Sequence, residues 1–143
     1  MANSFDGKRV LFLCLANSAR SPMAELLAPR FLGAGVIATS AGARPSCDPH
    51  PYAVEVMRDV GLDLSAHRPR AVEDIDAASV DLVVLLSDED VRSPALMDKP
   101  FVRARIADPA QHAMEFSRAM AIETFRCARE DIEDALAELA QKG

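Results

Sequence analysis

The sequence lacks the features that would assign it to a membrane or secreted class. No segment approaches the about 18 uninterrupted apolar residues of a membrane span, and the opening residues, MANSFDGKRV, hold no apolar run long enough for a signal peptide. Only three cysteines occur, at positions 14, 47 and 127, and an odd number at wide spacing is a poor disulfide framework. These absences predict a cytoplasmic protein in a reducing compartment.

An excess of positive charge is also absent. Sixteen Lys and Arg against 22 Asp and Glu give a net charge of −6, which argues against nonspecific binding to nucleic acid or to an anionic membrane. Any anion that binds must be held by a local site. The 143 residues contain no internal repeat, low-complexity segment or linker, so we expect one domain over residues 1–143, and a monomer.

Four short apolar runs, rich in Val, Ile and Leu, have the length of strands. Longer segments with helical spacing separate them, and this alternation predicts an α/β fold, in which helices cover both faces of a parallel sheet as a three-layer sandwich. The expected strands are Val10–Leu15, Val36–Ser40, Leu82–Leu86 and Val102–Ile106.

Three helices are expected between and after these strands. The first should begin at Ser21, a good N-cap, with Pro22 at the first helical position. Pro29 should kink or end this helix, because a proline inside a helix removes a hydrogen bond. A second helix should start near Pro51 and close at Gly61. The last helix carries a core-facing stripe of Ala121, Phe125, Ala128, Ile132, Ala135 and Leu139.

The stretch VLFLCLANSARSPMAE (residues 10–25) places Cys14 where the first strand turns into the first helix. Open α/β sheets bind ligands at the carboxyl ends of their strands. The free backbone N–H groups of a helix N-terminus and of a tight loop form a cradle for an anion there. The predicted oxyanion loop consists of Leu15, Ala16, Asn17, Ser18, Ala19 and Arg20.

The residue types in this loop favour nucleophilic chemistry. Amide dipoles and the Arg20 guanidinium favour the thiolate form of Cys14, and the planar guanidinium suits a tetrahedral oxyanion. Ser21 could donate a hydrogen bond to the sulfur, and Asn17 tolerates a left-handed backbone. The arrangement predicts attack by sulfur on a bound oxyanion; the alternative is a half-buried cysteine at a strand end.

A carboxyl group should lie at the same edge of the sheet. Asp108 and Pro109 follow the fourth expected strand, on a turn that proline stiffens. An acid at this position could protonate a leaving oxygen. The alternative is a simple turn.

Residues 10–25 resemble the first strand, loop and helix of the low-molecular-weight protein tyrosine phosphatase superfamily, whose loop reads C-x5-R-S, and within it the arsenate reductases. TSAGARPSCDPHPYAVEVMRDVGLDLSAHRPR is similar to a second block, and DLVVLLSDED and ADPA are similar to the third strand and the acid loop. The resemblance implies a four-stranded sheet of order 2-1-3-4, with Cys14 as nucleophile, Arg20 as anion clamp and Asp108 as general acid.

Two departures decide between members of this superfamily. Tyrosine phosphatases wall their pocket with aromatic residues, but the corresponding stretches read DPAQHAMEF and SAGARPSCD, which favours a small oxyanion such as arsenate, phosphate or sulfate. Thioredoxin-coupled reductases carry two more cysteines after the third strand. Here, in LLSDEDVRSP, those positions hold Leu86 or Ser87 and Arg92 or Ser93.

The resemblance therefore implies an arsenate reductase whose Cys14 adduct is resolved by an external thiol, with no tightly bound cofactor. That thiol could be glutathione or mycothiol, with a glutaredoxin-like partner. Cys47 is another possible resolving thiol, because its loop borders the active site in the family fold. The alternatives are a phosphatase, which would hydrolyse a cysteinyl-phosphate, and an oxyanion-binding protein without turnover.

Other polar residues are interpreted more simply. Cys47 and His50 supply too few ligands for zinc. By resemblance, Asn17, Glu25 and Ser40 match a potassium site behind the loop; alternatively they form hydrogen bonds that stiffen it. We expect Cys127 to be structural. Surface positions are predicted for His67, His112, Glu130, Asp131, Glu133 and Asp134.

Overall fold

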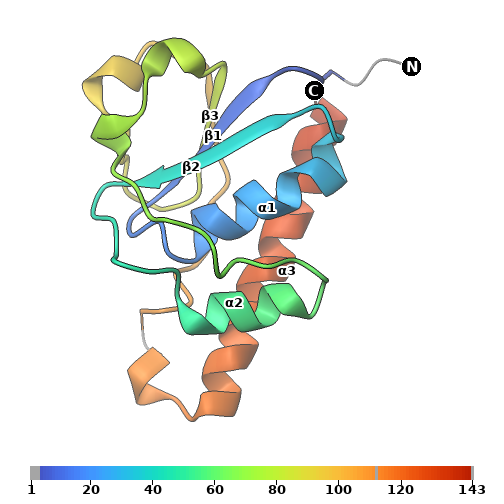
Figure 1. Ribbon diagram of the computed structural model, residues 1–143, viewed down its shortest axis with the longest axis vertical. Coiled ribbons are helices and arrows are strands. Elements are labelled where there is room, and N and C mark those ends of the chain that lie inside the picture. Colours follow the sequence, from blue (N-terminus) through green and yellow to red (C-terminus); the bar gives the residue numbers. More distant parts are fainter. Residues whose placement is uncertain (1–3, 112, 143) are drawn as a thin grey trace.

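The computed structural model describes residues 4–111 and 113–142. Its centre is a sheet of four parallel strands in the order β2-β1-β3-β4, with β1 and β2 crossing the middle of Figure 1. The α/β class that the sequence pattern predicted and the strand order that the resemblance implied are confirmed. The strands are β1 (Arg9–Cys14), β2 (Ile37–Gly42), β3 (Leu82–Leu85) and β4 (Phe101–Arg103).

The strand β4 ends earlier than the apolar run Val102–Ile106 predicted. Regular pairing stops at Arg103, yet the backbone N–H of Ala104 donates to Leu85 O at 2.8 Å and that of Ile106 to Leu86 O at 2.9 Å. The chain therefore stays beside β3 in an irregular form. Consequently the segment that follows β4 reaches the same sheet edge as Cys14, the last residue of β1.

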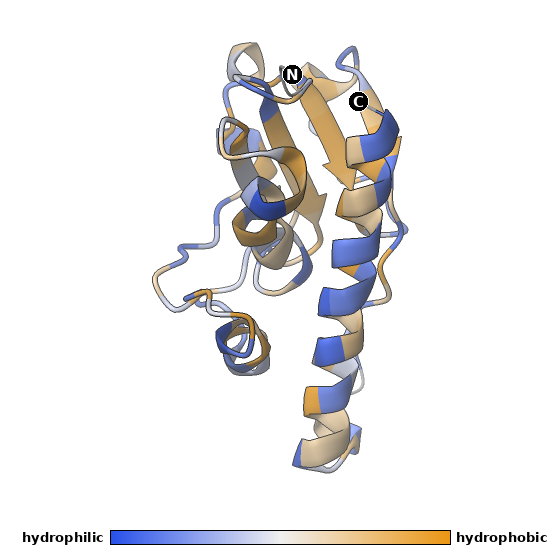
Figure 2. Ribbon diagram, turned by 90° about the vertical axis from the view of Figure 1, so that its right-hand side faces the viewer, coloured by the Kyte–Doolittle hydropathy of each residue, from blue (hydrophilic) through white to orange (hydrophobic). Residues whose placement is uncertain are grey.

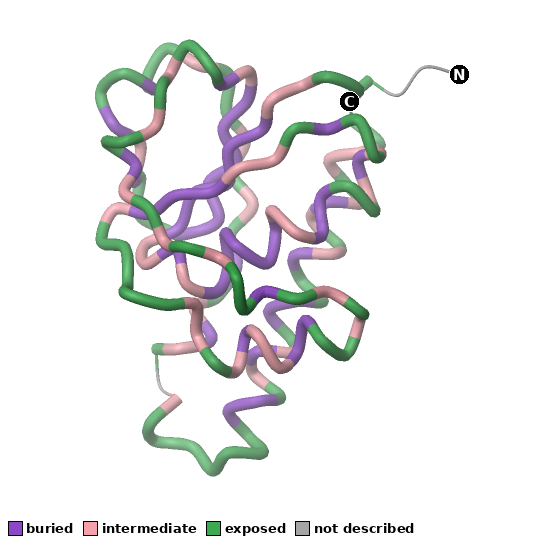
Figure 3. The backbone as a smooth tube through the Cα atoms, viewed as in Figure 1, coloured by how far each residue is buried: buried purple, intermediate pink, exposed green. Residues whose placement is uncertain are grey.

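Helices lie on both faces of the sheet, as predicted, but the three α-helices all lie on one face and only short 3-10 helices lie on the other. The helices α1 (Arg20–Leu32), α2 (Pro51–Arg58) and α3 (Arg118–Lys142) share one core with Phe12 of β1. Short 3-10 helices share the other core with Leu11 and Leu13: η1 (Val72–Asp74), η2 (Ala77–Ser79) and η3 (Pro94–Leu96). A fourth, η4 (Ala113–Glu115), precedes α3. Figure 3 shows the buried backbone concentrated along the strands and the inner faces of α1 and α3.

The start of α1 corrects the prediction. The helix begins at Arg20, and its N-cap, Ala19, makes no side-chain capping bond. Ser21 is therefore the second helical residue and not the N-cap. Its hydroxyl contacts the Cys14 sulfur and does not cap the helix backbone. Pro29 does not end the helix, which continues to Leu32. As expected, α2 begins at Pro51 and its closing turn contains Gly61, with a φ of 79°.

The stripe predicted on α3 is buried over its first half. Ala121, Phe125, Ala128 and Ile132 are all in the core. Further along, Leu136 is buried, whereas the predicted Ala135 and Leu139 are half-buried and line an open groove of about 400 Å³ between α3 and β4. In Figure 2, α3 runs along the side of the molecule and extends beyond the sheet, with polar residues on its outer side.

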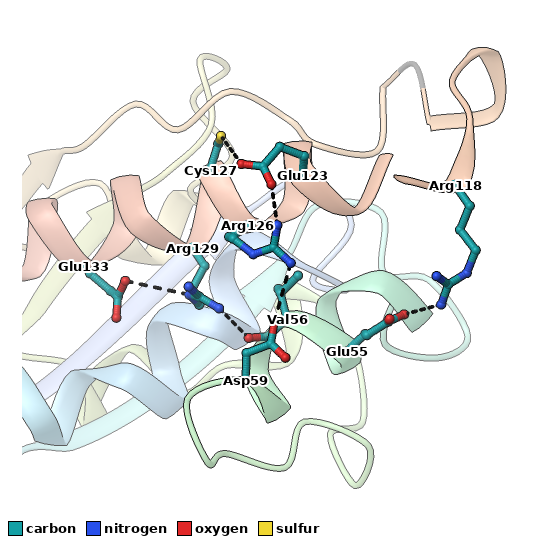
Figure 4. Close-up of polar contacts among 9 residues, drawn as sticks. All are labelled: Glu55, Val56, Asp59, Arg118, Glu123, Arg126, Cys127, Arg129 and Glu133. Atoms are coloured by element: carbon teal, nitrogen blue, oxygen red, sulfur yellow. Dashed lines mark hydrogen bonds and ion pairs between the residues drawn. The ribbon is translucent and has the colours of Figure 1, made fainter. Parts of the chain in front are cut away.

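Arg129 is a buried charged residue on α3 that the apolar stripe did not predict. It is 8% exposed, and its Nη1 donates to the carbonyl of Val56 in α2 at 2.6 Å, while its Nε lies 3.7 Å from Glu133 (Figure 4). Glu133 is therefore half-buried rather than fully solvated. Ion pairs of Arg118 with Glu55 and of Arg126 with Asp59 also join α3 to α2.

Three further expectations concern Cys127, membrane-spanning helices and His112. Cys127 is exposed, so it does not have the structural role expected for it. Within the described ranges no helix is both long and apolar enough to cross a membrane. The predicted surface position of His112 lies outside the described residues.

Candidate active site

The loop between β1 and α1 holds Cys14 in a fixed hydrogen-bonded position. Cys14 is 2% exposed, and its Sγ lies 2.9 Å from the Oγ of Ser21. The backbone N–H of Ser21 also donates to this sulfur at 3.4 Å. A hydroxyl and an amide at the N-terminus of α1 thus converge on one thiol and fix the position of its sulfur.

Asn17 is the centre of this loop. Its φ of 50° is in the left-handed region, where the sequence anticipated it. Its Nδ2 donates to Ser21 Oγ at 2.8 Å and to Ser40 Oγ at 3.0 Å, and its Oδ1 accepts from the backbone N–H of Arg70 at 2.9 Å. Asn17 is fully buried, so these bonds tie the loop to β2 and to the segment before η1.

The three residues considered for potassium do lie together. Ser40 Oγ donates to Glu25 Oε1 at 2.8 Å and accepts from Asn17. Because Asn17 presents its amide nitrogen here, it acts as a donor to this cluster and not as an oxygen ligand. The contacts agree with the loop-stiffening interpretation, and the potassium site stays a prediction. No three His, Cys, Asp or Glu side chains of the described chain are grouped to hold a metal ion.

His67 is not a simple surface residue, and the sequence interpretation is corrected here. Its Nε2 lies 3.1 Å from both the backbone O and the Oδ1 of Asn17. Burial is the main cause that lowers its pKa, and the nearby Glu25 opposes the shift. The contact spans 50 residues of sequence, so no local pattern indicates it; the only signal was its place in the AHRPR stretch that carried the resemblance.

The loop after β2 runs against the oxyanion loop. Three backbone N–H groups donate across: Arg44 to Leu15 O at 2.8 Å, Ser46 to Ala16 O at 2.9 Å, and His50 to Ser18 O at 2.8 Å. Cys47 lies exposed in this segment, directly after Ser46. The segment that carries Cys47 thus runs beside the oxyanion loop, Cys47 is not among the residues that line the cavity described below, and its resolving role stays a prediction.

Gly42, at the end of β2, permits this close approach. A Cβ at Gly42 would lie 2.7 Å from Leu15 O and 2.8 Å from Asn17 N, closer than a Cβ atom comes to backbone atoms in real proteins. Gly42 also pairs with Cys14 in the sheet register. Only glycine therefore lets the oxyanion loop pass over the end of β2.

His50 connects this loop to α2. Its Nδ1 accepts the N-cap bond from Tyr52 N at 3.1 Å, and its ring lies 4.4 Å, centroid to centroid, from that of Phe125. Burial lowers the pKa of His50, while the charge of Asp108 acts in the opposite direction. Neutral imidazole is therefore the form that caps α2.

Arg20 and Asp108 lie side by side above the loop. Arg20 is 7% exposed; its Nη1 donates to Ile106 O at 3.0 Å, and its Nη2 lies 3.8 Å from Asp108 Oδ2. The other carboxylate oxygen of Asp108 accepts from Ala110 N at 3.0 Å. The first turn of α1 and the segment after β4 thus place a fixed cation and a half-exposed carboxyl at one sheet edge.

These two side chains open into a cavity of about 520 Å³, called the active-site cavity below. Its described lining combines both signs of charge with small apolar groups and contains no aromatic ring and no cysteine. Sequence reasoning missed the outer part of this lining, although Asp88 and Arg105 follow β3 and β4 by two or three residues. The lining residues are Leu15, Arg20, Asp88, Glu89, Arg105, Ile106, Ala107, Asp108 and Gln111.

The family model of low molecular weight phosphotyrosine protein phosphatases matches residues 9–142. The chain belongs to this family. The segment after β3, where some relatives in the superfamily were expected to carry redox cysteines, is well packed in this member: Leu86 and Ser87 are buried, and Arg92 pairs with Asp90 at 2.7 Å.

Several proteins are similar over most of the chain. A "Glutaredoxin arsenate reductase" of Synechocystis sp. is 33% identical over 94% of this chain and 98% of its own length. An "Arsenate reductase" of Staphylococcus aureus is 36% identical over 85% of this chain and 98% of its own. The solved arsenate reductase of Archaeoglobus fulgidus has a TM-score of 0.77 at 28% identity, covering 92% of this chain and 98% of that one.

A solved arsenate reductase in the phosphate-binding state is also similar, with a TM-score of 0.76 at 30% identity. The match covers 94% of this chain and 98% of that one. The likeness therefore extends over nearly the whole chain.

Proposed function

We propose that this protein reduces arsenate to arsenite and that an external thiol supplies the electrons. The proposal rests on one observation above all: a buried, hydrogen-bonded Cys14 directly precedes Leu15, which together with Arg20 lines a cavity whose described lining has no aromatic ring. Such a cavity suits a small tetrahedral oxyanion better than a phenyl ring, which aromatic walls would sandwich. The names of the similar proteins support the same substrate.

The first step uses three side chains. Arg20 and the N–H groups of the loop would bind arsenate, with the guanidinium fork on two of its oxygens. The Cys14 thiolate attacks arsenic, and Asp108 gives a proton to the departing oxygen, which leaves as water. The product is an adduct in which arsenic(V) is bonded to the Cys14 sulfur.

The second step reduces arsenic. An external thiolate attacks the Cys14 sulfur, the sulfur–arsenic bond breaks, and its electron pair stays with arsenic, which leaves as arsenite. Arsenic gains two electrons and the two sulfurs lose one each, forming a mixed disulfide. Glutathione, or mycothiol with a glutaredoxin-like partner, could supply the thiol, and either would fit a cytoplasmic location.

Cys47 is the alternative resolving thiol. Its loop is bonded to the oxyanion loop through Ser46 N and Ala16 O, and an attack by Cys47 on Cys14 would give an internal disulfide. The variant Cys47→Ser separates the two routes. Unchanged turnover with an external thiol would exclude a resolving role for Cys47.

Phosphatase activity is the second candidate, because the matching family model describes phosphotyrosine protein phosphatases. Cys14, Arg20 and Asp108 could equally form and hydrolyse a cysteinyl-phosphate. The deciding experiment tests one preparation with an aryl phosphate, with arsenate and thioredoxin, and with arsenate, glutathione and a glutaredoxin. Fast aryl phosphate turnover without arsenate turnover would refute the reductase proposal, and activity of Cys14→Ser would refute the mechanism.

A further inference from the structure

We propose that the active-site cavity binds the reducing thiol itself, and that it selects a low-molecular-weight thiol that carries an α-amino acid group. This inference rests on the proposed arsenate reduction. Its starting point is that the described lining of the cavity contains no thiol, although it includes Leu15, the residue after Cys14. The reductant therefore has to enter from solvent and reach the Cys14 sulfur past the residues at the outer rim.

The outer rim carries opposite charges next to one another. Arg105 Nε lies 3.7 Å from Asp88 Oδ1, and the carboxylate of Glu89 also lines the cavity. Both acidic residues are held by their backbones, since Arg103 Nη1 donates to Asp88 O at 2.7 Å and Ser87 Oγ donates to Glu89 O at 3.1 Å. The charges therefore sit on a fixed segment and not on a free loop.

An α-amino acid group matches this rim. It carries an ammonium and a carboxylate on a single carbon, so Asp88 and Glu89 can bind the ammonium while Arg105 binds the carboxylate. A neutral thiol would gain neither contact. At about 520 Å³ the cavity is within the usual size of small-molecule sites, with room for a tripeptide-sized thiol outside the oxyanion held by Arg20.

Bound in this way, the thiol would point inward along Leu15, the residue after Cys14. Its thiolate then attacks Cys14 Sγ as described above, so that arsenite leaves and the thiol remains as a mixed disulfide on Cys14. Binding at the rim raises the local concentration of the reductant and leaves the oxyanion contacts of Arg20 and Asp108 untouched. The rim thus affects the second step and not the first.

The test compares variants with two reductants, glutathione and the neutral thiol 2-mercaptoethanol, at saturating arsenate. In Asp88→Asn/Glu89→Gln and in Arg105→Gln, we expect the KM for glutathione to rise about fivefold, as for exposed charge pairs. Turnover with 2-mercaptoethanol and the KM for arsenate should not change. Because each thiol is compared between variant and wild type, its own reactivity cancels.

The neighbouring pair Asp90 and Arg92 supplies matched controls. These residues pair with each other at 2.7 Å and do not line the cavity, so Asp90→Asn and Arg92→Gln should keep the KM for glutathione. A second measurement is the rate at which the Cys14–glutathione mixed disulfide forms in a Cys47→Ser/Cys127→Ser background, followed by mass. It should fall in the rim variants alone.

The outcomes separate the two proposals. Rim variants with the same KM for glutathione as the wild type, or with equal losses for glutathione and 2-mercaptoethanol, would overturn the thiol site while arsenate reduction stands. No arsenate turnover by the wild type with any thiol, dithiothreitol included, would overturn the proposed function itself.

Discussion

The Sγ of Cys14 lies 2.9 Å from the hydroxyl of Ser21, the second residue of α1, and receives the backbone N–H of the same serine. The hydroxyl and the backbone N–H of one residue therefore both contact the sulfur. Ser21 in turn accepts from Asn17, so its hydroxyl proton is free to point at Cys14.

The first prediction concerns this pair. Ser21→Ala should lower kcat/KM for arsenate by about 10- to 100-fold, because a hydrogen bond to a charged group is lost. Iodoacetamide should also alkylate Cys14 more slowly in a Cys47→Ser/Cys127→Ser background. Ser46→Ala is the control, since Ser46 contacts the loop through its backbone only. Equal kinetics of Ser21→Ala and wild type would contradict this role.

Gly42 allows a second prediction. Gly42→Ala should destabilise the fold by about 1–3 kcal/mol and weaken binding of inorganic phosphate, because the new methyl group displaces the backbone of Leu15 and Asn17. Urea denaturation and calorimetric titration measure the two effects. A variant with native stability and native phosphate affinity would show that the loop is not held against β2.

The hydrogen bonds of the Asn17 side chain can be tested with two substitutions. Asn17→Gly keeps the left-handed backbone accessible but removes the hydrogen bonds, and should lose about 2–3 kcal/mol of unfolding free energy. Asn17→Ala adds backbone strain at a φ of 50° and should lose about 1 kcal/mol more. Equal stabilities of the two variants would show that the backbone conformation contributes nothing.

His50 predicts a dependence of stability on pH. Its pKa in the folded protein is below the ordinary 6.5, so near that pH the unfolded chain binds more protons than the folded one. The free energy of unfolding is then highest above about pH 6.5 and falls as the pH drops through this value. Protonation of Nδ1 would also remove the cap of α2.

The variant His50→Asn keeps a good N-cap without a titrating group. Its unfolding free energy should fall less than that of the wild type between about pH 8 and about pH 5.5, as measured by urea denaturation. His67, whose pKa is also lowered, adds the same pH dependence to the unfolding free energy of both proteins, so its contribution cancels in the comparison. A parallel fall in both proteins would assign the pH dependence to other groups.

Arg129 predicts how strongly α2 is tied to α3. Arg129→Met preserves much of the buried stem but leaves the Val56 carbonyl without its donor, which should cost about 1–3 kcal/mol. Arg126→Met, on the same helix, removes an equal charge from a more exposed position and should cost less than about 1 kcal/mol. Urea denaturation measures both losses. A midpoint of Arg129→Met equal to or above that of Arg126→Met would contradict the prediction.

Much of this architecture could be predicted from the sequence, because it depends on patterns that repeat locally. The apolar runs predicted the strands, and apolar residues spaced three and four positions apart predicted the buried first half of the α3 stripe. Cys14 at the end of an apolar run was informative for the same reason: in a parallel sheet the residue that ends a strand always lies at the carboxyl edge. The position of Asp108 followed from the same argument.

The tertiary structure alone decided which residues meet across the chain. His67 contacts Asn17, and Arg129 bonds to Val56. It also placed Asp88 and Arg105 on one cavity rim. None of these pairs has a sequence signature, because a contact between distant residues depends on how strands and helices pack, whereas a periodic pattern reports only on which face each residue lies.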